Sequence, residues 1–235
     1  MAAGERFELF LAGPGEAPHQ WIRLEYRIDD ITVHLFAPRD PDQLLDDPGV
    51  QRASVERDYM PYWAYVWSSS VVLARHVVEL DQGRLAGLRV LELGCGLGLP
   101  GLVAAKLGAR VTFNDLSPLA LEAVAASARA NGVQPAGLIA GSWQDLAEAS
   151  FDLVLGADVL YEIRCAEELA RVLPRLVACG GLGLLVDPMR STADRFLGEV
   201  ASHPELAVDV ADGARENGHR HRVIRVRRWA RNRGD

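Results

Sequence analysis

The feature that most constrains this chain is a glycine-rich segment near its middle, residues 90–101, VLELGCGLGLPG. Its first residues predict a short buried strand, its glycines a tight turn, and its apolar end the start of a helix. A strand, a turn and a helix N-terminus in this order form the nucleotide-binding unit of α/β proteins. The segment therefore predicts an α/β fold with a nucleotide-like ligand at this turn, although an ordinary strand-to-helix turn is the alternative.

An acid before the glycines separates two cofactor classes. Glu92 would repel the pyrophosphate of a dinucleotide, but it favours the ammonium and sulfonium groups of S-adenosylmethionine. The glycine spacing agrees, because the sixth position of a dinucleotide fingerprint is glycine and here it is Leu99. We therefore predict S-adenosylmethionine as cofactor and S-adenosylhomocysteine as product. The residues expected to bind it at the turn are Glu92, Gly94, Cys95, Gly96 and Gly98.

A second predicted strand ends in another acid, Asp115. In nucleotide-binding α/β folds, a carboxylate about 20 residues after the glycine turn accepts hydrogen bonds from the ribose. Asp115 could instead cap the helix that begins at Pro118, but Ser117 can occupy that cap position itself. We therefore expect Asp115 to bind the ribose and Leu116 to line the same site.

Composition narrows the class of protein. The 235 residues suit one α/β domain with an N-terminal extension, and a hydrophobic content of 49% is ample for one core. No apolar run reaches the roughly 18 residues of a membrane span, and Met1–Phe10 lacks the apolar core of a signal peptide. Three cysteines and scattered histidines show no metal-ligand spacing. We therefore expect a cytoplasmic protein without a metal or a membrane partner.

The charge disfavours a nucleic-acid partner, because the formal net charge is -7. The segment Arg220–Arg233 is nevertheless rich in arginine. We interpret it as the solvated edge of a C-terminal strand followed by a frayed tail. A patch for an acidic protein or for RNA is the alternative.

From residue 88 onward the chain alternates strands and helices, which indicates a mostly parallel sheet covered on both faces. The strands are predicted at 89–93, 110–114, 137–140, 153–156 and 182–187, and the helices at about 100–107, 118–131, 166–178 and 192–202. The chain should end in an antiparallel pair, 207–210 and 222–228, with a loop at 211–218. Before residue 88, we predict a hairpin of strands 21–26 and 31–36, a polar loop at 38–48 and a helix at 68–80.

Three motifs resemble those of a known family when taken in order. They are the aromatic segment 62–67 (YWAYVW), the glycine turn running into Leu99-Pro100-Gly101, and Asp158-Val159-Leu160-Tyr161 after the strand at 153–156. Together they resemble class I, seven-β-strand methyltransferases, in the protein lysine methyltransferase branch often labelled nicotinamide N-methyltransferase-like. The usual tryptophan–proline pair of the aromatic segment is missing, since Ser68 follows Trp67.

The resemblance implies a Rossmann-like, seven-stranded, mostly parallel sheet with an antiparallel C-terminal strand. We accordingly divide the chain into an N-terminal extension with a β-hairpin, residues 1–58, and an S-adenosylmethionine-dependent methyltransferase domain, residues 59–235. The implied activity is N-methyl transfer to a protein side chain, most simply lysine, by a monomer.

The resemblance also implies roles for aromatic and acidic residues. Trp67 and Trp143 would cover the cofactor, with Trp143 beside adenine, and Ala157 would line the site; plain core packing is the alternative for both tryptophans. Asp158 and Tyr161 follow the strand where the transferred methyl should emerge. Asp158 could hold the incoming ammonium, and Tyr161 could orient the nitrogen or assist departure of its proton. These two are the predicted catalytic residues, with a helix cap and a rim aromatic as the alternatives.

Several other functions stay open at this point. Arginine is a possible target in place of lysine, and a small-molecule N-methyltransferase would use the same residues. A nicotinamide-dependent oxidoreductase would need a Tyr-x-x-x-Lys pair, but Lys106 is the only lysine. A non-enzymatic cofactor-binding protein would have no use for Asp158 and Tyr161.

Overall fold

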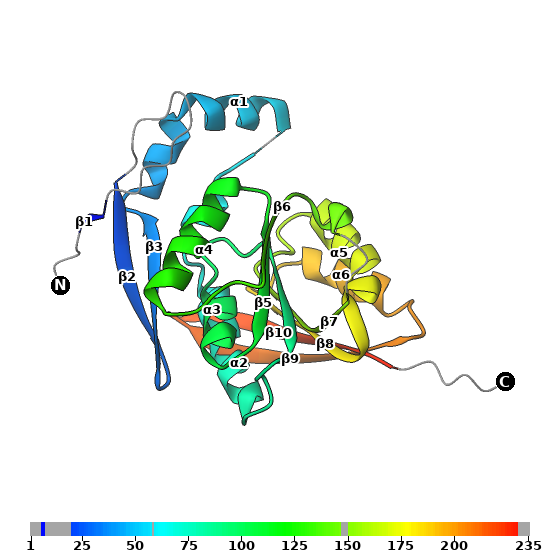
Figure 1. Ribbon diagram of the computed structural model, residues 1–235. Helices are drawn as coiled ribbons and strands as arrows, with labels where there is room; N and C mark the ends of the chain where they lie inside the picture. Colours follow the sequence, from blue (N-terminus) through cyan, green and yellow to red (C-terminus); the bar gives the residue numbers. More distant parts are fainter. Residues whose placement is uncertain (1–5, 8–19, 58, 147–149, 230–235) are drawn as a thin grey trace.

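The computed structural model describes residues 6–7, 20–57, 59–146 and 150–229, which form two sheets (Figure 1). The larger sheet has seven strands in the order β6-β5-β4-β7-β8-β10-β9. Strands β4 to β8 run parallel, β10 is antiparallel to β8, and β9 is antiparallel to β10. This arrangement confirms the predicted Rossmann-like sheet. Its strands are β4 (Arg89–Leu93), β5 (Arg110–Asp115), β6 (Gly137–Ala140), β7 (Phe151–Ala157), β8 (Val177–Asp187), β9 (Leu206–Glu216) and β10 (His219–Arg228).

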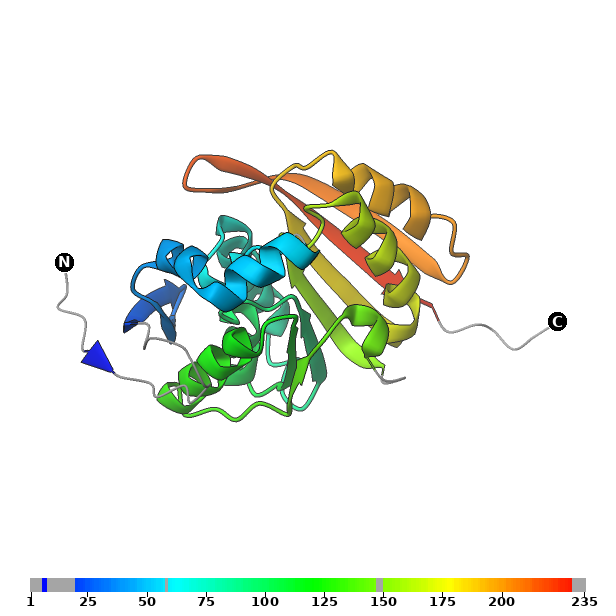
Figure 2. The ribbon, with the colours of Figure 1, turned by 90° about the horizontal axis from the view of Figure 1, so that it is seen from above.

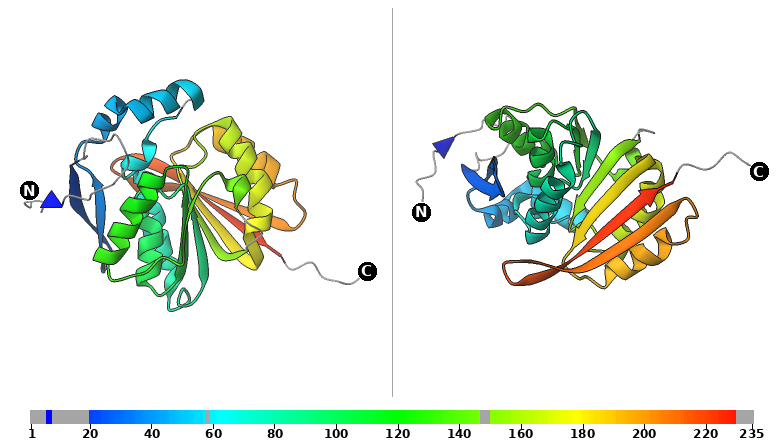
Figure 3. Two further views of the ribbon diagram at one scale, coloured as in Figure 1. Left: turned by 45° about the horizontal axis from the view of Figure 1, so that its top comes forward. Right: turned by 90° about the horizontal axis from the view of Figure 1, so that it is seen from below.

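Helices cover both faces of this sheet (Figures 1 and 3). Side chains alternate along the strands, so Leu153 and Leu155 of β7 belong to one hydrophobic cluster and Val154 to the other. Helices α2 (Ser68–Asp81), α3 (Leu99–Lys106) and α4 (Pro118–Ala130) pack on the first cluster, whereas α5 (Ile163–Leu176) and α6 (Thr192–Val200) pack on the second. Near-continuous apolar strands are therefore buried on both sides, as the sequence predicted.

The N-terminal hairpin shares the first of these clusters. Strands β2 (Trp21–Ile28) and β3 (Ile31–Pro38) turn at Asp29, which has a φ of 50°, and the short β1 (Arg6–Phe7) pairs with β2. The Asn131 side chain at the end of α4 pairs with both backbone groups of His34, at 3.0 and 2.6 Å. The hydroxyl of Ser127 accepts a hydrogen bond from the Phe36 amide at 2.8 Å. Helix α4 thus holds the hairpin through polar contacts as well as apolar packing.

The predicted polar loop at 38–48 is only partly correct. A 3-10 helix, η1 (Pro41–Asp46), buries Leu44, and α1 (Pro48–Arg57) follows it. The sequence of α1 is polar, so it lacks the apolar period by which a helix is recognised. Figure 2 shows α1 lying over the end of the sheet at which the parallel strands finish.

Two further predictions near the C-terminus were wrong. The loop predicted at 211–218 is strand, since β9 and β10 form a long hairpin that turns at Asn217 and Gly218 and extends past the sheet (Figure 2). Its distal part is polar on both faces, which removes the alternation that marks a strand. Helix α5 ends at Leu176, earlier than predicted, because Val177 has an extended backbone and begins β8.

The arginine-rich segment is not an edge strand either. Strand β10 lies between β8 and β9, so β9 forms the edge. Arg222 pairs with Asp194 of α6 at 2.7 Å and with Asp212 of β9 at 3.3 Å, and Arg225 pairs with Asp209 at 3.6 Å. Arg222 and Arg225 therefore balance acids of neighbouring elements, and residues 230–233 lie outside the described residues. Among the helices of the described ranges, none has the length and apolar character of a membrane span.

Candidate active site

The site lies where the strand order reverses. Strand β4 pairs with β5 on one side and with β7 on the other, so the loops that follow these three strands meet at one end of the sheet. Open α/β sheets bind their ligands at such a switch point. The glycine turn follows β4, Asp115 ends β5, and the segment Asp158–Tyr161 follows β7, as the sequence predicted.

The glycine turn needs its glycines for both conformation and space. Gly94, Gly96 and Gly98 have φ values of 53°, 51° and 74°, in the left-handed region. A Cβ on Gly96 would lie 3.1 Å from the carbonyl oxygen of Trp63, and one on Gly98 would lie 2.9 Å from Val124. The turn is therefore packed between the aromatic segment and α4.

Glu92 binds a backbone amide in the first turn of the helix that follows the glycine turn. Its Oε2 accepts a hydrogen bond from the backbone amide of Gly101 at 2.8 Å, in the first turn of α3. Burial raises the pKa of Glu92 to about 8, although the bond from Gly101 acts in the opposite direction. A dinucleotide pyrophosphate would need helix N-terminal amides of this kind, and here one of them donates to the chain's own acid. The geometry thus argues against a dinucleotide; contact of Glu92 with a cofactor cation stays a prediction.

Asp115 joins the glycine turn to the end of β5. Its Oδ2 accepts a hydrogen bond from the Gly96 amide and its Oδ1 one from the Ser117 amide, both at 2.9 Å. Burial raises its pKa. Ser117 is the N-cap of α4, so the cap alternative for Asp115 is wrong. Leu116, between them, is 61% exposed beside the turn. Asp115 therefore lies where a ribose ligand is expected.

The aromatic segment contributes one buried and several exposed rings. Trp63 is buried and stacks on Trp21 with ring centroids 6.3 Å apart, which is a packing role. Trp67 precedes α2, and its Nε1 donates to the Tyr62 carbonyl at 3.0 Å. The Tyr62 ring lies 6.0 Å from Trp67 and 5.9 Å from Tyr161. The segment before α2 and the loop after β7 therefore meet through aromatic contacts.

Asp158 is already paired with a cation of this chain. Arg190 donates to both of its carboxylate oxygens, from Nε at 2.7 Å and from Nη2 at 3.2 Å. Asp158 has a positive φ of 55°, and its amide donates to Val186 of β8 at 2.8 Å. It does not cap α5, because Glu162 holds that position. A substrate ammonium that used Asp158 would have to share it with Arg190.

Asp187 completes this arrangement from the end of β8. Its Oδ1 accepts a hydrogen bond from the Arg190 amide at 2.7 Å, and burial raises its pKa to about 6. Within the described part of the chain, its buried Oδ2 has no hydrogen-bond partner. Sequence reasoning assigned neither Asp187 nor Arg190 a role. The signal was a cation three residues after an acid that ends a parallel strand.

Tyr161 follows β7, and Trp143 follows β6, at the end of another parallel strand. Burial, followed by the neighbouring Cys165, raises the pKa of Tyr161 well above its ordinary value, so its phenol stays protonated near neutral pH. Trp143 begins a short 3-10 helix, η3 (Trp143–Asp145), and packs partly buried against the second cluster; its carbonyl accepts from Arg175 at 3.1 Å. Ala157 is the half-buried last residue of β7. The proposed contacts of these residues with a cofactor stay predictions.

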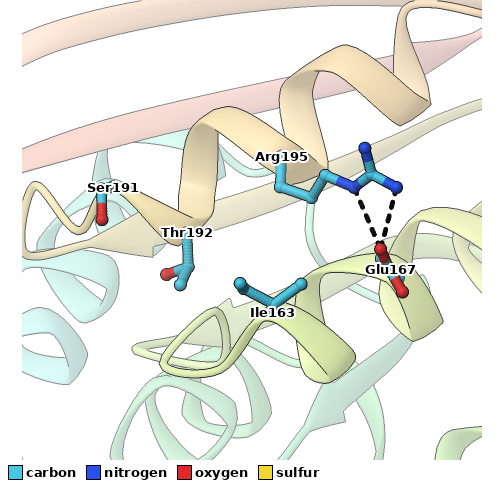
Figure 4. A pocket seen from close by; sticks show the side chains of 5 residues that line it. All are labelled: Ile163, Glu167, Ser191, Thr192 and Arg195. Atoms are coloured by element: carbon cyan, nitrogen blue, oxygen red, sulfur yellow. Dashed lines mark hydrogen bonds and ion pairs between the residues drawn. The ribbon is translucent and has the colours of Figure 1, made fainter.

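A surface pocket opens beside the same loops, between α5 and α6 (Figure 4). The Thr192 hydroxyl in its wall donates to the Leu160 carbonyl of the segment after β7. Arg195 and Glu167 pair across it at 2.9 Å. The pocket is lined by Ile163, Glu167, Ser191, Thr192 and Arg195.

Comparison with known proteins decides the family. A family described as lysine methyltransferase matches residues 61–202, which include the aromatic segment, the glycine turn and Asp158–Tyr161. This chain belongs to the lysine methyltransferase family. The resemblance stated from the three motifs is thereby confirmed.

Some relatives of this family member are named lysine methyltransferases, and others are named arginine methyltransferases. Protein N-lysine methyltransferase METTL21A of Danio rerio is 39% identical over 146 residues, which are 58% of this chain and 66% of that protein. Histone-arginine methyltransferase METTL23 of Homo sapiens is 40% identical over 105 residues, 42% of this chain and 55% of that protein. Electron transfer flavoprotein beta subunit lysine methyltransferase of Xenopus laevis is 31% identical over 148 residues, which are 62% of this chain and 57% of that protein. The chain thus spans about half to two thirds of the length of these relatives.

Solved structures agree on the fold of this lysine methyltransferase family member. A 16S rRNA N2 G1207 methyltransferase of Thermus thermophilus, solved with AdoMet and guanosine, covers 91% of this chain and 52% of its own at a TM-score of 0.60 and 19% identity. A SAM-dependent methyltransferase from Streptococcus mutans covers 92% and 57% at a TM-score of 0.61 and 13% identity. At such identities the likeness shows a shared fold.

Proposed function

We propose that the protein is an S-adenosylmethionine-dependent methyltransferase that methylates a side-chain nitrogen of a protein, namely lysine. The observation that carries this proposal is the pair of buried acids at the glycine turn, Glu92 and Asp115, which bind the amides of Gly101 and Gly96. Acids in this position leave an anionic pyrophosphate no favourable place, and they suit a ligand with positive charge and ribose hydroxyls.

The residues present fit this cofactor. When bound, it supplies a methyl group on a cationic sulfur. Asp115 would accept hydrogen bonds from the ribose, Trp143 would lie against the adenine, and Glu92 with the glycine turn would hold the methionine end. Trp67 and Ala157 would line the same space, and Leu116 would cover its outer side. Burial of the two acids supports these roles, because a cation offsets the cost of an ionised buried carboxyl group.

The substrate class follows from the family and from the loop after β7. Named lysine methyltransferases are among the relatives. The phenol oxygen of Tyr161 can accept a hydrogen bond from an N–H of the amine and so orient its free electron pair toward the methyl group. Asp158 and Tyr161 are the proposed catalytic residues, with Asp158 dependent on its pairing with Arg190. Arginine is the second candidate target, because relatives named histone-arginine methyltransferase match with similar identity.

The compartment is part of the same proposal. Cys95, Cys165 and Cys179 are all free thiols in the structure. Free thiols persist in reducing compartments, which supports a cytoplasmic enzyme. A tagged copy of the full chain, followed by fractionation and microscopy, tests this point independently of activity.

The first experiment is titration calorimetry with S-adenosylhomocysteine, with NADH as the control ligand. Binding of S-adenosylhomocysteine alone supports the proposed cofactor, whereas binding of NADH alone, or of neither ligand, contradicts it. Radiolabelled S-adenosylmethionine is then incubated with the protein and a cell lysate. Protease-sensitive label supports a protein substrate over a small molecule, and amino-acid analysis of the labelled protein separates methyl-lysine from methyl-arginine.

A further inference from the structure

We propose that Tyr62, Trp67 and Tyr161 form the recognition site for the positively charged end of the substrate side chain, in place of Asp158. We call these three residues the aromatic corner. The inference rests on the proposed function, because it concerns the substrate that this site would take. Its consequence is that the site recognises a cation by ring faces and not by a carboxylate.

The three rings are exposed, contiguous and set at steep angles. Their exposed fractions are 45%, 40% and 37% for Tyr62, Trp67 and Tyr161. Tyr62 lies between the other two, at interplanar angles of 74° to Trp67 and 70° to Tyr161. Adjoining exposed aromatic rings mark a binding surface, and a cation within about 6 Å of a ring centroid is attracted by the ring face. The arrangement therefore presents aromatic walls to a solvent-facing cation.

Hydrogen bonds hold the aromatic corner in place before any ligand arrives. Trp67 Nε1 donates to the Tyr62 carbonyl at 3.0 Å, and the Ser70 hydroxyl donates to the Trp67 carbonyl at 2.7 Å. The neighbouring Tyr65 donates to Asp42 of η1, and its ring centroid lies 5.8 Å from that of Trp67. A rigid surface loses little conformational entropy when it binds. The rings are thus preorganised.

The aromatic corner adjoins the glycine turn on two sides. The carbonyl of Trp63, next to Tyr62, lies 3.1 Å from the position of a Cβ on Gly96. Val159, two residues before Tyr161, lies 3.2 Å from the position of a Cβ on Gly94. Both segments that carry the rings therefore contact the turn at which the cofactor is proposed to bind. A side chain held at the rings would end close to that turn.

The carboxylate of Asp158 is occupied by Arg190, so the rings are the accessible partner for a substrate cation. Arg190 donates to both oxygens of Asp158, and two-bond pairs of this kind are among the stronger hydrogen-bonded contacts in proteins. Asp187 also faces Arg190, at 2.7 Å from its amide. Because Asp187 is buried and Asp158 is occupied by the Arg190 guanidinium, the exposed ring faces are the accessible partner for a substrate cation.

Recognition by ring faces also affects how many methyl groups one nitrogen can receive. A carboxylate holds an ammonium through its N–H groups, and each methylation removes one of them. Ring faces bind the charge and need no N–H, so they hold methylated and trimethylated ammonium as well. We therefore expect the aromatic corner to keep a partly methylated lysine in place for a further transfer.

The test uses the full chain saturated with S-adenosylhomocysteine and two small probes. One is Nα-acetyl-Nε-trimethyl-lysine amide, and the other is its neutral analogue, in which a tert-butyl group replaces the trimethylammonium group. NMR titration should show the cationic probe binding about two- to thirtyfold more tightly than the neutral one, the range of a cation at an aromatic face. Equal affinities, or no binding of the cationic probe, would overturn the inference.

Matched variants locate the binding. Tyr62→Leu and Trp67→Leu should each weaken binding of the cationic probe about two- to thirtyfold, whereas Tyr62→Phe keeps a ring face and most of the affinity. Trp229→Leu removes an exposed indole outside the aromatic corner and should change nothing. Unchanged affinity in Tyr62→Leu and Trp67→Leu would contradict the proposal. Thermal unfolding of each variant verifies that it is folded.

A double variant separates the aromatic corner from the carboxylate. Asp158→Asn with Arg190→Gln removes both partners of the ion pair together, so it exposes no unpaired charge. The cationic probe should retain its affinity within about threefold, because the rings remain; loss of binding would make Asp158 the cation partner. S-adenosylhomocysteine affinity is measured separately. A wild type that fails to bind it contradicts the proposed function, whereas one that binds it but does not discriminate between the probes contradicts only this inference.

Discussion

The Oε2 atom of Glu92 lies 2.8 Å from the backbone nitrogen of Gly101, so an acid of strand β4 closes the first turn of helix α3. The two residues lie on either side of the glycine turn. Their hydrogen bond therefore fixes the ends of the loop that the cofactor is proposed to contact. It also places a buried carboxyl group where its protonation depends on what lies beside it.

Stability should depend on pH through Glu92. Its pKa is raised from the ordinary value of 4.5 to about 8 in the folded protein, with burial as the main cause. Between these two values the folded protein holds a proton that the unfolded chain has lost, so the free energy of unfolding falls as pH rises. Glu92→Gln should flatten this fall. Urea unfolding of both proteins from pH 5 to pH 8 checks the prediction, and parallel curves would show that Glu92 titrates normally.

Gly101→Ala should destabilise the protein strongly. A Cβ there would lie 2.4 Å from Glu92 Oε2 and 2.4 Å from the Phe113 ring, with no space for either to move freely. We expect a loss of about 1–3 kcal/mol, as for overpacking of a core. Gly198→Ala in α6 is the matched control, because a Cβ there has nothing within 4 Å and alanine favours a helix by up to about 1 kcal/mol. Equal melting temperatures for the two variants would refute the packing argument.

Asp115→Ala should affect both stability and cofactor binding. The Gly96 and Ser117 amides would lose their acceptor, which costs about 1–3 kcal/mol for a buried donor. If Asp115 also binds the ribose, S-adenosylhomocysteine affinity falls in calorimetry. Asp115→Asn keeps one acceptor oxygen and should lie between alanine and wild type in both measurements. Wild-type affinity in a folded Asp115→Ala protein would remove Asp115 from the ribose site.

Ser68 and His221 should stabilise each other. The Ser68 hydroxyl, at the first position of α2, lies 2.9 Å from Nε2 of the buried His221 on β10. A double-mutant cycle with Ser68→Ala and His221→Leu should give a coupling of about 0.5–1.5 kcal/mol in chemical unfolding. Additive losses would show that the contact contributes nothing.

The pH dependence of His221 has the opposite sign to that of Glu92. Burial lowers the pKa of His221 below its ordinary value of 6.5. The unfolded chain therefore gains a proton before the folded protein does, and the stability from neutral His221 is lost as pH falls below about 6.5. In His221→Leu this loss at low pH should disappear. Measuring the variant beside Glu92→Gln separates the two contributions.

Local sequence patterns were sufficient to predict much of the fold and part of the candidate site. The strands at 89–93 and 137–140 have their predicted bounds, and the glycine turn lies between a strand and a helix as expected. These features depend on neighbours in the chain: apolar runs bury strands on both faces, and glycine accepts the positive φ of a tight turn. Asp115 and the segment after β7 meet the turn because parallel strands place their carboxyl ends at one edge.

The partners of the key side chains were decided by packing. Arg190 reaches Asp158 only because β7 and β8 are neighbours and the loop after β8 folds back over the end of β7. Ser68 contacts His221, which is 153 residues away in the sequence, because α2 packs against strands β8, β9 and β10. The sequence alone does not show that the carboxylate of Asp158 is paired with the guanidinium of Arg190, 32 residues away. Such pairings depend on which strands and helices become neighbours, a property of the whole chain that no short pattern contains.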